Sequence, residues 1–124
     1  MKRLRSQSGA VAVEFALVVP FLLLMLLGIV EFGRIFNAQI QITSAAREAA
    51  RVMAIETDVG AAVSTAIASA PGLNPTLSTS QVSVTPCTTS ADTTVTITYS
   101  LDLVAGLFAD AVPLTARGVM RCGG

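Results

Sequence analysis

Few residues in this sequence have the types and spacing that catalysis needs. The chain has 124 residues and no histidine, and its eight Asp and Glu residues are scattered, with no pair spaced for acid–base work. No candidate base accompanies a serine or threonine, and no glycine-rich phosphate loop is present. Two cysteines without a histidine do not make the usual ligand set of a zinc site. The sequence therefore predicts no catalytic, cofactor-binding or metal site, and we do not expect an enzyme.

One acidic residue, Glu14, lies in an unusual place. It falls within the apolar run of residues 10–30, which would form a helix about as long as the ~30 Å hydrocarbon core of a bilayer. A charge at the centre of a membrane helix costs about 2.5–3.5 kcal/mol, so such residues usually have a partner or a function. Near the end of the span the cost is smaller, and a Glu that simply reaches the interface is the alternative interpretation.

The charge distribution indicates a membrane protein with an exported C-terminal part. Only 13% of the residues are charged and the mean hydropathy is +0.69, which is too apolar for an ordinary soluble domain. Lys2, Arg3 and Arg5 precede the apolar run without any acid among them, and such basic residues stay cytoplasmic. The remainder has no excess of basic residues, so the expected partner is the lipid bilayer and not a nucleic acid.

Several motifs in the first half of the chain occur in a characteristic order. Gly9 is followed by Glu at the fifth place and Phe at the sixth, which resembles a class III signal peptide, the sequence that prepilin peptidases cut in type IV pilins. Further motifs follow at Pro20, at Glu31-Phe32-Gly33-Arg34 and at Ala-Ala-Arg-Glu-Ala-Ala-Arg over residues 45–51. Together they resemble the TadE-like family, the minor pseudopilins of tight-adherence (Flp-type) pili, over about residues 8–54.

The resemblance implies a role and a location. It implies cleavage between Gly9 and Ala10 by a prepilin peptidase, and pairing of Glu14 with the new amine of a neighbouring subunit. It also implies a part in pilus biogenesis, adhesion and secretion, with other pseudopilins, the major pilin and the inner-membrane assembly platform as partners. The expected location is the bacterial inner membrane, single-pass, with the N-terminus cytoplasmic and the C-terminal domain periplasmic, or the pilus itself.

Two other interpretations of the apolar run stay open. The first is an unprocessed signal-anchored membrane protein with a small exported binding domain. The second is a secreted protein released by ordinary signal peptidase. Against the second, the run is too long for a typical signal core, it contains Glu14, and no small-x-small cleavage site closes it.

The helix is expected to continue beyond the membrane. Residues 31–56 contain no proline, and their apolar positions form one stripe at three- and four-residue steps. Within the span, Pro20 lacks an N–H, so we expect a kink or a loosened turn there, unless the proline is merely tolerated. Glu31 and Arg34 share a helical face, either as an interfacial anchor or as a salt bridge to another subunit.

The remainder predicts a small α+β domain. Asp58 can cap a helix over residues 59–70, and alternating apolar residues predict strands over 81–85, 94–104 and 114–122. Residues 88–93 fit a hairpin loop, and 106–110 a turn or a short helical piece. The expected fold is α+β and pilin-like, with a long N-terminal helix packed on a three-stranded antiparallel sheet. Its segments are a leader (1–9), a transmembrane helix (10–30), an amphipathic continuation (31–56) and an α+β domain (57–124).

Cys87 and Cys122 both lie on the expected exported side, at the ends of predicted strands. A domain of this size buries little core, so a covalent link would help it fold. We prefer a disulfide between them over two free thiols. The chain-entropy model gives such a disulfide roughly 3–4 kcal/mol.

Overall fold

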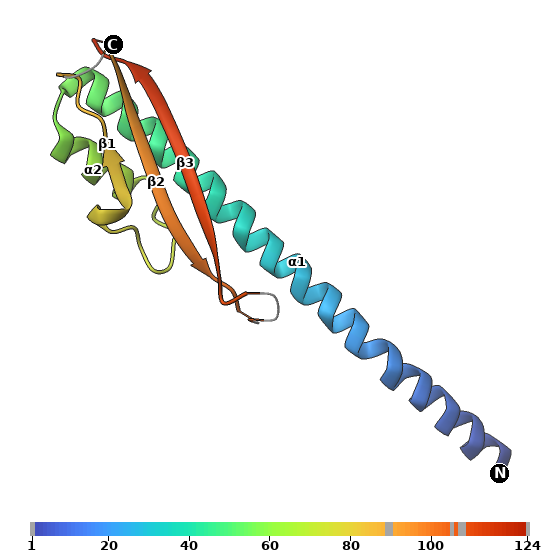
Figure 1. Ribbon diagram of the computed structural model, residues 1–124. Coiled ribbons are helices and arrows are strands. Elements are labelled where there is room, and N and C mark those ends of the chain that lie inside the picture. The colour runs from blue at the N-terminus through green and yellow to red at the C-terminus, as the bar shows by residue number, and fades with distance from the viewer. Residues whose placement is uncertain (1, 89–90, 105, 107–108, 124) are drawn as a thin grey trace. The chain divides into compact units, whose positions relative to one another are not determined.

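The fold consists of one long helix, a short helix and a small sheet (Figure 1). The computed structural model describes residues 2–88, 91–104, 106 and 109–123. The helices are α1 (Lys2–Glu56) and α2 (Val59–Ala68), with a 3-10 turn η1 (Thr79–Gln81). The antiparallel strands β1 (Val82–Val84), β2 (Asp92–Asp102) and β3 (Ala111–Arg121) are arranged in the order β1-β2-β3. The predicted α+β arrangement, a long N-terminal helix with a three-stranded antiparallel sheet, is confirmed.

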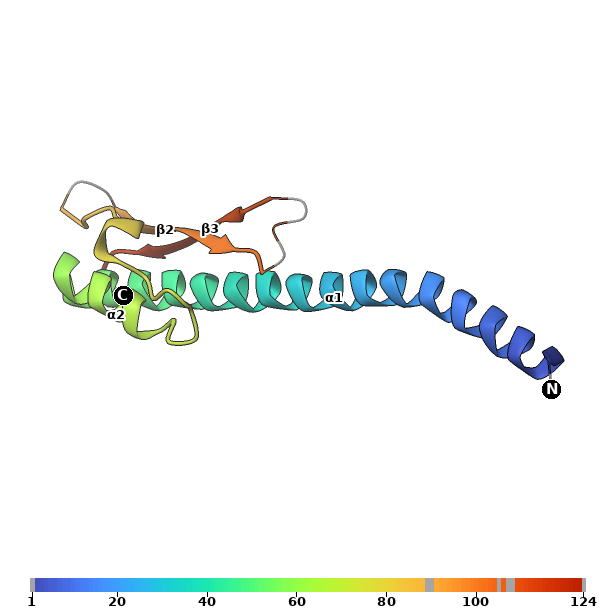
Figure 2. The ribbon, with the colours of Figure 1, turned by 90° about the horizontal axis from the view of Figure 1, so that it is seen from below.

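The chain divides into two compact units, and α1 contributes to both. The N-terminal unit is Met1–Gly33 and the C-terminal unit is Arg34–Gly124. Residues 34–56 of α1 therefore form a single unit with α2 and the sheet. Figure 2 shows β2 and β3 lying along this part of the helix.

The sheet packs on a face of α1 that consists mainly of alanine. This face was predicted as an apolar stripe, and the structure confirms it. Small side chains let the strands approach the helix closely, and Ile42 and Met53 are the large side chains buried on this face. The buried residues of this face are Ala38, Ile42, Ala45, Ala46, Ala49, Ala50, Met53 and Ala54.

Strand β3 lies very close to the backbone of α1 at Gly118. A Cβ atom built there would lie 2.6 Å from the carbonyl carbon of Ala46 and 2.8 Å from the backbone nitrogen of Arg47. Real Cβ atoms do not approach backbone atoms so closely. Only glycine therefore allows β3 to lie at this distance from α1.

Strand β2 forms the centre of the sheet. Val95, Ile97, Tyr99 and Leu101 alternate inward and are buried, as the period-2 pattern predicted. The strand runs over Asp92–Asp102, two residues earlier than expected. The predicted loop 88–93 and turn 106–110 fall partly outside the described residues, at 89–90 and 107–108.

Strand β3 begins at Ala111, three residues before the predicted start, and includes Pro113. Pro113 pairs with Ser100 in the register of β2 and β3. It lies on an edge strand, where a missing N–H need not remove a bond of the ladder. This explains why the proline does not end the strand.

The connection between α1 and α2 is short and capped on both sides. Thr57 has a positive φ of 53°, and its N–H donates to the carbonyl of Met53 at 3.0 Å, which is the αL motif that ends helices. Asp58 Oδ1 then accepts the N–H of Gly60 at 3.0 Å as the N-cap of α2. The predicted cap at Asp58 is therefore present, and α2 ends at Ala68, two residues before the expected end.

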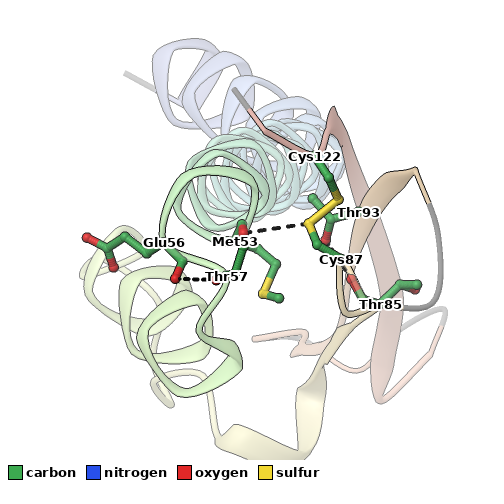
Figure 3. The surroundings of a disulfide bond; sticks show 7 residues. All are labelled: Met53, Glu56, Thr57, Thr85, Cys87, Thr93 and Cys122. Carbon is green, nitrogen blue, oxygen red and sulfur yellow. Dashed lines mark hydrogen bonds between the residues drawn. A yellow bond between two sulfur atoms is a disulfide. The ribbon is translucent and has the colours of Figure 1, made fainter.

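A disulfide joins the chain just after β1 to the chain just after β3, beside the last turn of α1 (Figure 3). Cys87 and Cys122 are bonded, with their Cα atoms 5.7 Å apart, which confirms the predicted bridge. The sulfur of Cys87 lies 3.7 Å from the carbonyl oxygen of Met53. The N–H of Gly123 donates to the carbonyl of Ala54 at 3.1 Å. Two carbonyls of the last turn of α1 thus contact the residues around the bridge.

Tyr99 contributes the one buried phenol of the core. Its hydroxyl donates to the carbonyl of Pro75 at 2.8 Å, so it connects β2 to the loop after α2. Burial raises the pKa of Tyr99 above its usual value, and the nearby Asp102 carboxylate adds to this, while Arg34 opposes it. The folded state therefore favours the neutral phenol.

We expect the stability of the C-terminal unit to fall at alkaline pH. A raised folded-state pKa means that Tyr99 contributes stability below the unfolded pKa of about 10 and loses it as the pH rises through the folded value. Chemical denaturation of the full chain in detergent between about pH 8 and 12 measures this. At the lower end of this pH range, the free energy of unfolding of Tyr99→Phe should be about 1 kcal/mol below that of wild type, because the hydrogen bond to Pro75 is lost. Its free energy of unfolding should also depend less on pH. An equal alkaline loss in that variant would contradict the assignment.

Candidate assembly and processing segment

The segment of residues 10–30 of α1 has apolar side chains on all sides of the helix, with Glu14 as the exception. Its large hydrophobic side chains are exposed, with values such as 69% for Phe15 and 70% for Phe21. One helix of the described chain is long and apolar enough to cross a membrane, and its most apolar window has a mean hydropathy of 2.7 with none of it buried. Water does not favour so large an exposed apolar surface. The helix therefore suggests a membrane anchor.

Glu14 is the only charged residue of this apolar segment. Its side chain is exposed, and among the described residues it has no hydrogen-bond or ion-pair partner. Ala10 lies four residues earlier on the continuous helix, so the two positions are neighbours on one face. The carboxylate is thus available to a partner outside this chain.

The bond between Gly9 and Ala10 lies inside α1. Helix α1 begins at Lys2, eight residues before the start expected from the apolar run. Lys, Arg, Leu and Gln in the leader favour helix, and no proline separates them from the span. A Cβ at Gly9 would have no atom within 4 Å, so neighbouring side chains do not shield this position.

Pro20 is also inside α1, and the helix continues on both sides of it. Its missing N–H leaves one carbonyl of the preceding turn without its usual helical donor. The helical hydrogen bonds are interrupted at this one position only. The kink or loosened turn expected at Pro20 stays a prediction.

Arg34 has a partner that sequence patterns did not indicate. Its Nη1 donates to the backbone carbonyl of Asp102 at 3.1 Å and so connects α1 to the end of β2 within the C-terminal unit. Asp102 is 68 residues away in the chain, so helical spacing contains no signal for this contact. Glu31 belongs to the N-terminal unit, and the interfacial role of the two residues stays a prediction.

Other polar side chains of α1 also bind the C-terminal unit. Gln41 accepts the N–H of Gly72 through Oε1 at 2.9 Å, and Gln39 donates to the carbonyl of Thr115 at 3.2 Å. Sequence patterns do not distinguish these glutamines, because they share the polar face of the helix with solvated residues. Among the described residues, no group of three or more His, Cys, Asp or Glu side chains gathers as a metal site would require.

Comparison with known proteins gives a family match for the N-terminal part of the chain. No curated protein and no solved structure matches it. The family model described as TadE-like protein matches residues 9–51, roughly a third of the chain. The match includes Gly9, Glu14 and Pro20, but not α2 or the sheet. Residues 9–51 are therefore a TadE-like segment, and that family implies a protein associated with the tight-adherence (Tad) pilus.

Proposed function

We propose that the chain is a minor pseudopilin of a Tad pilus system. The observation that carries this proposal is the TadE-like match, which begins at Gly9 and includes Glu14. In this role the chain is not an enzyme but the substrate of one. It takes part in pilus biogenesis, adhesion and secretion.

Processing prepares the segment for assembly. A prepilin peptidase hydrolyses the peptide bond between Gly9 and Ala10, which removes Lys2, Arg3 and Arg5 and leaves an ammonium group on Ala10. That amine has a reference pKa of about 8 and is mostly protonated at neutral pH. Because the bond lies within a helix, the peptidase must locally unwind residues near Gly9 to reach it.

Glu14 then selects the axial position of the subunit. An unpaired carboxylate or ammonium in an apolar bundle is costly, while the two together stabilise each other. The Ala10 amine of one subunit pairs with Glu14 of its neighbour, and a subunit in another register leaves both groups unpaired. The Glu14 carboxylate is exposed and has no partner among the described residues, which supports this role.

The surroundings of the protein follow from the anchor and the basic leader. The N-terminus lies in the cytoplasm, the apolar helix crosses the bacterial inner membrane, and the C-terminal unit is periplasmic. Its partners are the prepilin peptidase, other pseudopilins, the major pilin and the inner-membrane assembly platform.

Two substitutions in the native host test this function. Gly9→Ala should leave a longer protein that begins at Met1, because the peptidase no longer cleaves. Glu14→Ala should be processed to Ala10 but enter sheared pili about tenfold less, since a lost charge-assisted pair costs about 1.5–3 kcal/mol. Mass spectrometry of the N-terminus and quantification in pilus and membrane fractions measure both effects.

Glu56→Ala is the matched control, because this acid is exposed and lies outside the TadE-like segment. It should be processed and assembled normally. An intact leader on wild-type protein from piliated cells would instead indicate the signal-anchored membrane protein with a small exported binding domain.

A further inference from the structure

Strand β3 is an edge strand, and its backbone N–H and C=O groups point alternately toward β2 and toward the open edge of the sheet. The N–H of Cys122 donates to Ala91 and the N–H of Leu103 donates to Asp110, both in the register of β2 and β3. Antiparallel pairs alternate between bonded and non-bonded residues. Even-numbered residues of β3, such as Gly118, therefore bond to β2, and odd-numbered ones turn their N–H and C=O toward the open edge.

Few of the outward backbone groups of β3 are hydrogen-bonded among the described residues. Among the described residues, the N–H groups of Arg117 and Val119 make no hydrogen bond, and their carbonyls accept none. The side chain of Gln39 donates to the carbonyl of Thr115, so the segment of the edge with unbonded backbone groups begins after Thr115. Proteins usually cover, shorten or kink an edge strand of this length, because it can pair with another chain.

A groove lies beside this edge, between β3 and the flank of α1. It has a volume of about 490 Å³ and is lined by Met120 of β3 and by residues of α1 that include Ile40, Arg47 and Arg51. Met120 belongs to the inward side of β3, so the inward side chains of a strand added at the edge would enter the groove. The groove therefore offers apolar contact near Ile40 and Met120 and positive charge near the two arginines.

The charges around the groove favour an acidic occupant. Arg47 and Arg51 line it, whereas the side chain of Arg117 is on the opposite, exposed face of β3. Glu48 is the one acid in the lining, and its contact with Arg51 is long, at 3.9 Å between exposed side chains. A second copy would bring the same excess of arginine to the same edge, which opposes self-pairing.

We propose that the open edge of β3 receives an extended segment of a different protein chain, which adds a fourth strand to the sheet. Backbone hydrogen bonds to Arg117 and Val119 supply affinity, as in other cases of strand addition. Specificity comes from inward side chains that alternate between apolar and acidic. This proposal goes beyond the pilus role and does not depend on it.

Hydrogen exchange of single amides in the full chain, in detergent micelles, tests the proposal. The probe is an end-blocked eight-residue peptide in which threonine alternates with valine and glutamate. Alone, the amides of Arg117 and Val119 should exchange fast, and millimolar peptide should slow them at least tenfold while Thr96 on β2 is unchanged. A peptide with lysine in place of glutamate, and one methylated on its backbone nitrogens, should have little effect.

Three results would overturn it. They are slow exchange at Arg117 and Val119 in dilute chain alone, no slowing with the glutamate peptide, and equal slowing with the lysine peptide. Slowing that follows protein concentration without peptide would also overturn it, in favour of a second copy as the occupant.

Variants separate edge pairing from general binding. Val119→Pro removes an outward N–H, at the same parity as the native Pro113, and should abolish the slowing at Arg117. Val119→Thr keeps the N–H and should retain it. If the proline variant unfolds, as judged by its thermal midpoint, Arg47→Glu decides: the lysine peptide should then bind better than the glutamate peptide, and an unchanged preference would refute the proposal.

Discussion

Gly118→Ala is expected to destabilise the C-terminal unit by about 3 kcal/mol, near the upper end of the cost of overpacking. The added methyl group would meet the backbone of Ala46 and Arg47, which cannot rotate away as a side chain would. Strand β3 would have to move off α1, and the alanine face beneath it would lose contacts. Denaturant unfolding of the full chain in detergent, followed by circular dichroism, measures the loss.

Gly60→Ala provides the matched control, because it makes the same change inside helix α2. A Cβ there would lie 3.4 Å from Asp58 Oδ1 and would meet no backbone atom. Alanine favours helix over glycine by up to about 1 kcal/mol, so this variant should keep or gain stability. Equal behaviour of the two variants would show that β3 does not rest on α1 as closely as described.

Removing the disulfide should lower the free energy of unfolding about as much as any single change in the chain. Cys87 and Cys122 are 35 residues apart, and the chain-entropy model assigns a loop of this length about 4 kcal/mol. The double variant Cys87→Ala, Cys122→Ala should therefore unfold at a much lower denaturant concentration. It should also loosen the chain after β3, where the N–H of Gly123 donates to the carbonyl of Ala54 in the last turn of α1.

A reductant distinguishes loss of the bridge from poor packing of the new alanines. Wild type treated with reductant should approach the stability of the double variant, and the variant itself should not respond. If reduced wild type stays as stable as the oxidised protein, the bridge contributes little to the folded state.

Sequence patterns predicted the parts of this fold that depend on local chemistry. The stripe from Ala38 to Met53 and the alternation of Val95, Ile97 and Tyr99 each report burial directly. The apolar run predicted a helix long enough to cross a membrane, and its side chains are exposed in the isolated chain. The N-cap at Asp58 and the bridge between the cysteines also followed from residue type and position. The family model confirms the resemblance carried by the motifs from Gly9 onward.

Features that depend on distant parts of the chain were not predictable in this way. Gly118 looked like one more small residue of a strand, because nothing local shows that Ala46 lies beneath it. The bond from Arg34 to Asp102 spans 68 residues. The start of β3 was placed three residues too late, and only the strand order shows that Pro113 lies at an edge, where a strand can include it.

The position of the bridge between Cys87 and Cys122 also sets an order of events during folding. Strand β3 follows every other described element in the chain, yet it supplies a close backbone contact with the helix at Gly118 and, directly after it, the second cysteine. Until β3 has been synthesised, the alanine face of α1 lacks the strand that lies against Ala46. The disulfide can therefore form only after synthesis has reached Cys122, so a bonded pair marks a chain in which every described strand is already present.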